Sequence, residues 1–228
     1  MVDLSGVNRA AAARGLCVLG AFQPNGQDDV PVLDNGNLPG TVVMIGNAGS
    51  ALWQHFAPHA DVVGEDHPLD VWTRAQVLAL AKPFDAVALF PFDGPPFYPF
   101  QRWAERAAPA SPSPLGLFIH REYGLWFALR AALLLENSEQ FLDAHREESP
   151  CVVCVEQPCL RTCPVGAFTG NGYEVDRCAQ FVATEAGRVC GESGCQARLA
   201  CPIGVPHQYE KAHMQFHMRQ FLISRLKA

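Results

Sequence analysis

The chain has 228 residues, of which 49% are hydrophobic and 18% are charged, and its formal net charge is −6. The hydrophobic content excludes an intrinsically disordered chain, and the length suits one or two compact domains. The acidic balance and the scattered basic residues argue against a nucleic-acid surface and against a polybasic membrane patch.

No stretch of the sequence approaches the roughly 20 apolar residues that a membrane-spanning helix needs. The longest apolar run, residues 125–135, is interrupted by Arg130. The N-terminus carries an alanine run but lacks the pattern of a signal peptide. We therefore expect a cytoplasmic protein with no membrane partner.

The first half alternates short helical and apolar segments. In chain order we expect a helix over 7–15, strands near 16–22 and 41–45, a helix from an Asn47 cap to about 57, a helix over 69–81 and a strand over 85–90. Residues 91–114, rich in proline and aromatic side chains, predict a loop before a strand over 115–120. Residues 126–135 suit either a helix or a buried strand. The polar stretch 136–150 marks a domain boundary, and 208–226 predicts a helix.

Eight of the nine cysteines lie between residues 151 and 201. Such crowding in a chain without a secretory signal indicates metal ligation rather than disulfides. The first four follow the spacing C-x2-C-x4-C-x3-C-P, which is close to the bacterial ferredoxin run whose fourth cysteine ligates a second cluster. Two Cys-Pro turns, at 163–166 and 201–204, form a pseudo-symmetric pair.

Eight thiolates are the number that two 4Fe–4S clusters require. An interleaved assignment gives one cluster Cys151, Cys154, Cys159 and Cys201, and gives the other Cys163, Cys178, Cys190 and Cys195. Structural zinc and disulfides are the alternatives, although zinc sites more naturally use separate C-x2-C knuckles. The ninth cysteine, Cys17, lies in an apolar strand, where we expect a small buried hydrophobic residue.

The cysteine-rich half resembles the ferredoxin module of epoxyqueuosine reductase and of the reductive dehalogenases. The matching pieces are residues 149–154, 159–164, 176–181 and 194–196, followed by Cys201-Pro202. The loops after Cys154, Cys190 and Cys195 are wider than in those families. The resemblance implies that the clusters pass electrons to a corrinoid held by the preceding domain.

The first half is similar to the cobalamin-processing family CblC, which has a flavin-reductase-like α+β fold. The similarity is densest at residues 117–130, LFIHREYGLWFALR, against a family pattern of the kind I-H-P-R-F-G-G-W-F-A-I-R. Weaker similarities lie at 38–44, at Asp70 and at 97–102. Arg121 and Leu125 stand where the family has proline and glycine. The resemblance implies a base-off corrinoid in a pocket and a strand over 126–135.

The candidate corrinoid contacts near this element are His120, Tyr123, Trp126 and Arg130. The family binds glutathione with the arginine that matches Arg130. Alternatively, Arg130 pairs with Glu122 or Glu136, because an unpaired buried charge is costly. His120 can hydrogen-bond a cofactor amide or a backbone carbonyl. The aromatic stretch 90–103 suits either a cover for a macrocycle or ordinary packing.

His213 and His217 stand four residues apart on the expected C-terminal helix. This spacing is compatible with metal binding, but neither a third ligand nor the glutamate of H-E-x-x-H accompanies the pair. A solvated helix face is therefore the favoured interpretation. Met214 and Met218 share the spacing and predict packing.

These features predict an α+β protein with a flavin-reductase-like, CblC-like domain over 1–148, a two-cluster ferredoxin-like module over 149–206 and a helix over 207–228. We expect an iron–sulfur oxidoreductase that delivers electrons from two 4Fe–4S clusters to a bound corrinoid (cobalamin). Its electron donor would be a flavodoxin, a ferredoxin or a reductase, and its substrate a corrinoid or another small molecule. A ferredoxin-type carrier without corrinoid and a corrinoid chaperone with structural or sensing clusters are the alternatives. Transfer RNA is not an expected substrate, because the C-terminal region that epoxyqueuosine reductase uses for it has no match.

Overall fold

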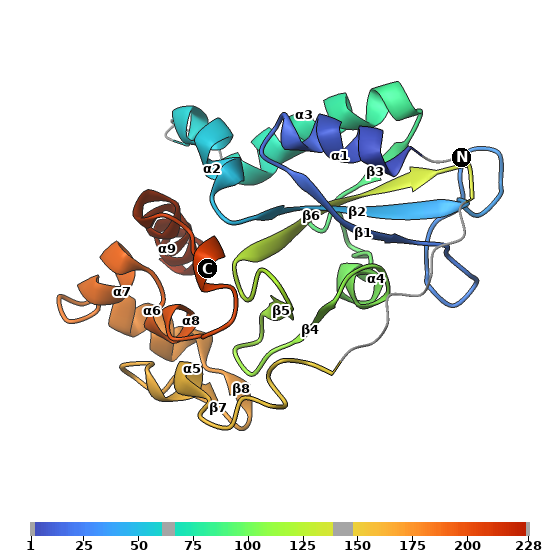
Figure 1. Ribbon diagram of the computed structural model, residues 1–228. Helices are drawn as coiled ribbons and strands as arrows, with labels where there is room; N and C mark the ends of the chain where they lie inside the picture. The colour runs from blue at the N-terminus through green and yellow to red at the C-terminus, as the bar shows by residue number, and fades with distance from the viewer. Residues whose placement is uncertain (1–2, 61–66, 139–147, 227–228) are drawn as a thin grey trace. The chain divides into compact units, whose positions relative to one another are not determined.

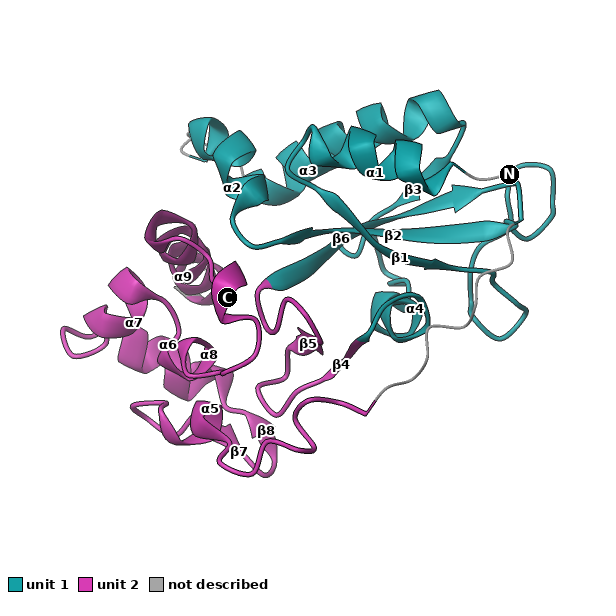
Figure 2. Ribbon diagram, in the orientation of Figure 1, with its two compact units in different colours: residues 1–109, 127–147 teal, residues 110–126, 148–228 magenta. Residues whose placement is uncertain are grey.

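A computed structural model describes residues 3–60, 67–138 and 148–226 of the chain. The chain divides into two compact units, which Figure 2 colours separately. Unit 1 comprises residues 1–109 and 127–147, and unit 2 comprises residues 110–126 and 148–228. This division differs from the sequence-based one, because a segment of the first half and the terminal helix both belong to unit 2. Within the described ranges, every helix is too short or too polar to span a lipid bilayer.

Unit 1 is built on a four-stranded antiparallel sheet in the order β1-β2-β6-β3 (Figure 1). The strands are β1 (Cys17–Phe22), β2 (Thr41–Ala48), β3 (Val87–Leu89) and β6 (Phe127–Leu135). β2 and β6 pair along their whole lengths, from Thr41 opposite Leu135 to Ala48 opposite Phe127. All of β2 except Ala48 is buried, which explains its almost continuous apolar sequence. The strand that the CblC resemblance implied over 126–135 is confirmed in β6.

Helices cover both faces of this sheet, with α1 and α3 on one face and α4 on the other (Figure 1). The helices of unit 1 are α1 (Leu4–Ala12), α2 (Ala51–Phe56), α3 (Pro68–Ala81) and α4 (Phe100–Ala107). α4 approaches β1 at Gly20, where an added Cβ would lie 1.8 Å from the carbonyl oxygen of Ala107. A glycine at this position therefore lets the helix and the strand touch through their backbones.

The structure corrects two expectations for the first half of the chain. The stretch 91–114 is not a loop, because it contains α4 and the strand β4 (Ala110–Pro112). α4 forms because Trp103 is fully buried and donates its indole N–H to the Asp28 carbonyl at 2.7 Å, while Arg106 pairs with the Asp28 carboxylate. Asn47 is not a helix cap either, since it lies inside β2 and Ser50 precedes α2.

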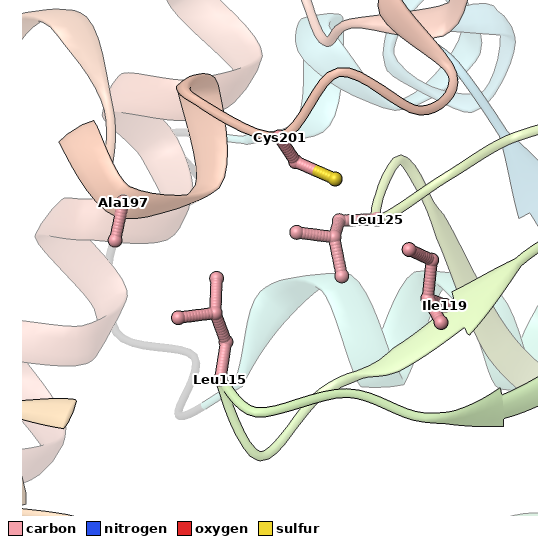
Figure 3. Packing of buried hydrophobic residues seen from close by; sticks show 5 residues of the cluster. All are labelled: Leu115, Ile119, Leu125, Ala197 and Cys201. Atoms are coloured by element: carbon pink, nitrogen blue, oxygen red, sulfur yellow. The ribbon is translucent and has the colours of Figure 1, made fainter. Parts of the chain in front are cut away.

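Unit 2 consists of short elements around a small apolar core (Figure 3). Its strands and helices are β4, β5 (Phe118–His120), α5 (Pro158–Arg161), β7 (Phe168–Thr169), β8 (Gly172–Tyr173), α6 (Val175–Val182), α7 (Arg188–Ser193), α8 (Gln196–Leu199) and α9 (Lys211–Leu226). The buried core residues are Leu115, Ile119, Leu125, Ala197 and Cys201. Four further cysteines pack against them: Cys151, Cys159, Cys163 and Cys195. Elements this short bury little apolar surface of their own, so the thiols form a substantial part of the core.

Candidate functional site

The eight clustered thiols of unit 2 come together in two sets of four. Group A is Cys151, Cys154, Cys159 and Cys201, whose thiols interact electrostatically with one another. Group B is Cys163, Cys178, Cys190 and Cys195, and the electrostatic interactions of these thiols likewise run within the group. These are the same two sets that the interleaved assignment uses.

Burial is the dominant influence on these thiols. It raises the pKa of six of them: Cys151, Cys159, Cys178, Cys190, Cys195 and Cys201. Neighbouring thiols of the same group raise the pKa further, because two thiolates close together repel each other. Four thiolates in one group are therefore unfavourable unless a cationic centre compensates their charge.

Backbone amides oppose this effect at several sulfur atoms. The Ala167 amide donates to Cys163 Sγ at 3.3 Å. The amides of Ala197 and Arg198, in the first turn of α8, donate to Cys195 and lower its thiol pKa. Such N–H donors stabilise negative charge on sulfur, which is how proteins tune the potentials of iron–sulfur clusters.

Group B lines a small pocket together with apolar side chains that include Phe168, Phe181 and Met218. In the described part of the chain, no three His, Cys, Asp or Glu side chains are placed to hold a single metal ion.

Tyr173 is a neighbour of group B that the sequence did not single out. Its ring stacks on Phe168 with 4.7 Å between the ring centroids, and its hydroxyl donates to the Cys178 sulfur. Burial and this hydrogen bond raise the pKa of Tyr173 above its usual range, so the phenol stays neutral. Only the short hairpin β7–β8 brings Tyr173 to the thiol, and no spacing motif marks that pairing.

Among the predicted corrinoid contacts, His120 is occupied in a turn of unit 2. Its Nδ1 accepts the backbone N–H groups of Glu122 at 3.1 Å and Tyr123 at 3.2 Å. The ring also stacks on Tyr123 with a centroid distance of 4.3 Å. Burial lowers the pKa of His120, which favours the neutral ring with its proton on Nε2. His120 Nδ1 therefore accepts from backbone amides, and the two partners suggested by the sequence, a cofactor amide and a backbone carbonyl, stay predictions.

Trp126 lies in a buried position of unit 2 with an unsatisfied donor. It is 1% exposed, and its indole Nε1 has no hydrogen-bond partner among the described residues. The Arg198 guanidinium covers its ring at 4.4 Å from the centroid, and Tyr209 meets the ring edge-on at 5.4 Å. A buried N–H without a partner costs free energy that a polar group of a bound molecule would recover.

Arg130, the fourth predicted contact, lies on β6 in unit 1. Its Nε donates to Asn47 Oδ1 at 2.8 Å across the β2–β6 pair. Its charge also lowers the pKa of Asp70, although burial outweighs this effect and leaves that pKa raised. Asp70 was not among the carboxylates suggested for Arg130, because it approaches from α3, 60 residues earlier in the sequence.

Arg198 and Tyr209 are structurally central residues of unit 2 that the sequence did not reveal. Arg198 Nε donates to the Leu125 carbonyl at 3.0 Å, and its guanidinium lies 4.6 Å from the Tyr209 ring centroid. Its side chain therefore joins α8, which lies between Cys195 and Cys201 in sequence, to the chain around Trp126. The partners are 73 residues apart in the sequence, so no local sequence pattern indicates the contact.

The C-terminal helix corrects the expectation of a solvated histidine face. His213 is fully buried, and its ring stacks on Tyr209 with 4.0 Å between centroids. α9 packs against α6 and α7, which places this side of the helix inside unit 2.

Neither a family model nor a curated protein matches the sequence. The structure is similar to a B12-trafficking CblC protein of C. elegans, with a TM-score of 0.54 and 14% identity over 96% of this chain and 93% of that one.

Epoxyqueuosine reductase gives matches of the same quality. The structure from Streptococcus thermophilus has a TM-score of 0.53 and 13% identity, covering 90% of this chain and 66% of that chain. A complex of epoxyqueuosine reductase with a modified tRNA-Tyr stem loop has a TM-score of 0.52 and 14% identity over the same shares. This chain thus spans slightly less than two thirds of the length of those reductases. The resemblance inferred from the sequence is confirmed at the level of fold: the chain has the mixed α+β architecture shared by CblC and epoxyqueuosine reductase.

Proposed function

We propose that this protein is an iron–sulfur oxidoreductase that delivers electrons from two 4Fe–4S clusters to a bound corrinoid. The observation that carries the proposal is the grouping of eight thiols into two sets of four, groups A and B. In this proposal residues 149–206 act as a two-cluster ferredoxin-like module, and the corrinoid binds to the CblC-like part of the chain.

The donor set fits iron–sulfur clusters. Thiolates are the usual ligands of 4Fe–4S clusters, and four are needed for each. The burial that raises the pKa of these thiols is offset when iron binds, because the metal stabilises the thiolate form. The four group B thiols line one pocket, as the ligands of a single centre would.

The corrinoid part of the proposal is supported by Trp126. A corrinoid presents a flat apolar face and a rim of amide groups, so it needs a broad apolar surface and a few polar anchors. The unsatisfied indole N–H of Trp126 supplies a donor for a rim carbonyl. When bound, the clusters supply one-electron reduction and the corrinoid supplies the cobalt that receives it. The protein's own contribution is to hold, bury and hydrogen-bond these groups.

A spectroscopic titration tests the proposal. Cluster-loaded protein is mixed anaerobically with cobalamin, and the cobalamin absorption bands are followed before and after chemical reduction of the clusters. We expect binding in the base-off form to shift the bands, and reduced protein to bleach cob(II)alamin. If the cobalamin spectrum is unchanged at high micromolar protein with intact clusters, the proposal of corrinoid binding is wrong. The protein is then a ferredoxin-type electron carrier.

Two variants of Trp126 sharpen this test. Trp126→Phe keeps an aromatic ring but removes the indole donor, so we expect corrinoid binding to weaken by about 1 kcal/mol. Trp126→Ala also removes the ring and should weaken binding by about 1–3 kcal/mol. Equal corrinoid affinity in wild type and both variants, with iron content preserved, would remove Trp126 from the binding site.

A corrinoid chaperone with structural or sensing clusters is distinguished from the reductase by turnover. With a strong reductant and excess cobalamin, a reductase processes many equivalents per chain, whereas a chaperone stops after one. In a physiological setting we propose a flavodoxin, a ferredoxin or a reductase as the electron donor.

One related structure contains a tRNA stem loop, so RNA is a partner that needs its own test. We propose a small-molecule or corrinoid substrate instead, because the net charge of −6 opposes binding to a phosphate backbone. Salt-sensitive binding of a stem-loop RNA in a mobility-shift assay would contradict this choice.

A further inference from the structure

His213 and His217 form a close pair inside unit 2. They lie one turn apart on α9, and their Nε2 atoms are 3.1 Å apart. The His213 side chain is fully buried and that of His217 is half-buried. Of the described residues of α9, Met218 lines the group B pocket and neither histidine does. The pair is therefore a separate feature from the eight thiols.

Tyr209 holds both rings in this arrangement. Its ring stacks on His213 with a centroid distance of 4.0 Å and an interplanar angle of 15°, and it lies 5.8 Å from the His217 ring at 28°. Tyr209 is itself buried and contacts Trp126 and Arg198. Because the rings are already fixed, a ligand that binds between the two Nε2 atoms requires little reorganisation.

The short distance between the two Nε2 atoms restricts how many protons they can carry. A neutral imidazole has one N–H and one lone pair. Two Nε2 atoms at hydrogen-bond distance therefore share a single proton, since two N–H groups would collide. When the ring that carries this proton on Nε2 changes to its Nδ1–H tautomer, both Nε2 atoms present lone pairs. A tetrahedral zinc ion with Zn–N bonds of about 2.0–2.1 Å holds two nitrogen ligands about 3.3 Å apart. The observed separation of 3.1 Å is within a few tenths of an ångström of that geometry.

We propose that His213 and His217 form a binding site for a divalent transition-metal ion of the class that imidazole favours, such as zinc. The two Nε2 atoms are its protein ligands, and the shared proton moves to Nδ1 of its own ring when the ion binds, so that both imidazoles stay neutral. Water or another exchangeable oxygen ligand fills the remaining coordination positions. A site with two protein ligands binds its metal reversibly, unlike a closed four-thiolate site.

Zinc itself is the probe. Anaerobically isolated full-length protein is dialysed against Zn²⁺, and the bound zinc and iron are measured by elemental analysis. We expect one zinc per chain with no loss of iron. The zinc X-ray absorption spectrum should show nitrogen ligands at about 2.0–2.1 Å rather than sulfur at about 2.3 Å. His217→Gln, which keeps a polar side chain, should weaken zinc binding at least tenfold.

The chain offers a matched control. His55 and His59 are also four residues apart, but both are exposed. The double variant His55→Gln/His59→Gln should bind zinc like the wild type. If His213→Gln loses iron through misfolding, the His217→Gln variant still tests the proposal, because the His217 side chain is only half-buried. Unchanged zinc affinity in His217→Gln, or zinc on sulfur with loss of iron, overturns the proposal. Iron-free protein that still binds nitrogen-coordinated zinc supports it, and contradicts only the cluster proposal.

Discussion

Cys17 differs from the other eight cysteines in its surroundings. It lies on β1 in unit 1, where its thiol donates to the Gly46 carbonyl at 3.7 Å. Burial raises the pKa of Cys17 to about 11, so the thiol is protonated at neutral pH and is a poor ligand. Cys17→Ala should leave the iron and labile sulfide per chain unchanged in elemental and colorimetric assays. A loss of half the iron would make Cys17 a ligand and break the two sets of four.

Asp70 provides a test of pH dependence. Burial raises the pKa of Asp70, and the positive charge of Arg130 offsets only part of the rise. A carboxyl with a higher pKa in the folded state binds more protons when folded, so the free energy of unfolding falls as pH rises from about 3.9 through the folded pKa. Asp70→Asn should remove this fall and be more stable than the wild type at pH 7. Denaturant unfolding at pH 3.5 and pH 7 measures it; a variant that is less stable than the wild type at pH 7 contradicts the assignment.

At the residue scale, the chemistry of single side chains was predictable but their partners were not. The sequence marked Arg130 as a charge that needs a partner, and Asn47 and Asp70 meet that need from β2 and α3. It also marked His213, but placed it on a solvated face because its burial depends on Tyr209 stacking and on packing against α6 and α7. Such contacts have no signature in a window of neighbouring residues.

At the scale of elements, two glycines have similar backbone but different surroundings: Gly166, which ends the first Cys-Pro turn, and Gly124, which approaches the second, 201–204. Gly124 and Gly166 have φ of +58° and +57°. An added Cβ at Gly124 would lie 2.0 Å from the Ile203 carbonyl oxygen, within the second turn, whereas at Gly166 it meets nothing within 4 Å. The chain before β6 thus touches the 201–204 turn through its backbone.

Alanine variants of these two glycines separate the effect of the backbone contact from the cost of a left-handed backbone conformation. Both Gly124→Ala and Gly166→Ala impose that cost, about 1–2 kcal/mol. Gly124→Ala adds a clash with backbone that cannot move freely, so its loss of unfolding free energy should be clearly larger. Denaturant unfolding of both variants makes the comparison, and equal losses would show that the 124–203 approach is not rigid.

The periodicity of apolar residues identified the long elements. It failed where contacts between residues distant in the sequence determine the structure. α3 was predicted within one residue, because its apolar positions recur at helical spacing over 14 residues. β6 suited helix and strand equally, and only the CblC resemblance favoured the strand. α4 was missed because proline-rich flanks obscured it and because Arg106 pairs with Asp28, 78 residues away.

At the scale of the whole chain, the two thiol groups are interlocked. Cys163 closes the first cysteine run in sequence but belongs to group B, and Cys201 comes last in sequence but belongs to group A. Cys163→Ser should therefore reduce bound iron by about half and also make the remaining cluster more labile to an iron chelator. Cys17→Ala serves as the control. Full iron content in Cys163→Ser would show that this thiol is not a ligand.

The division into units could not be predicted from the order of residues along the chain. Residues 110–126 precede β6 in sequence but belong to the compact unit of the cysteine-rich half. Leu115, Ile119 and Leu125 explain this, because they share a core with Ala197 and Cys201 (Figure 3). The spacing of the cysteines, in contrast, was sufficient to suggest both groups, because ligand geometry restricts that spacing strongly.

We propose that groups A and B each hold a 4Fe–4S cluster. The most direct measurement is the iron, labile sulfide and zinc content of full-length protein isolated and reconstituted without oxygen. We expect about eight iron and eight labile sulfide per chain, as two clusters require. Zinc on the thiols with no labile sulfide in anaerobic material would contradict it.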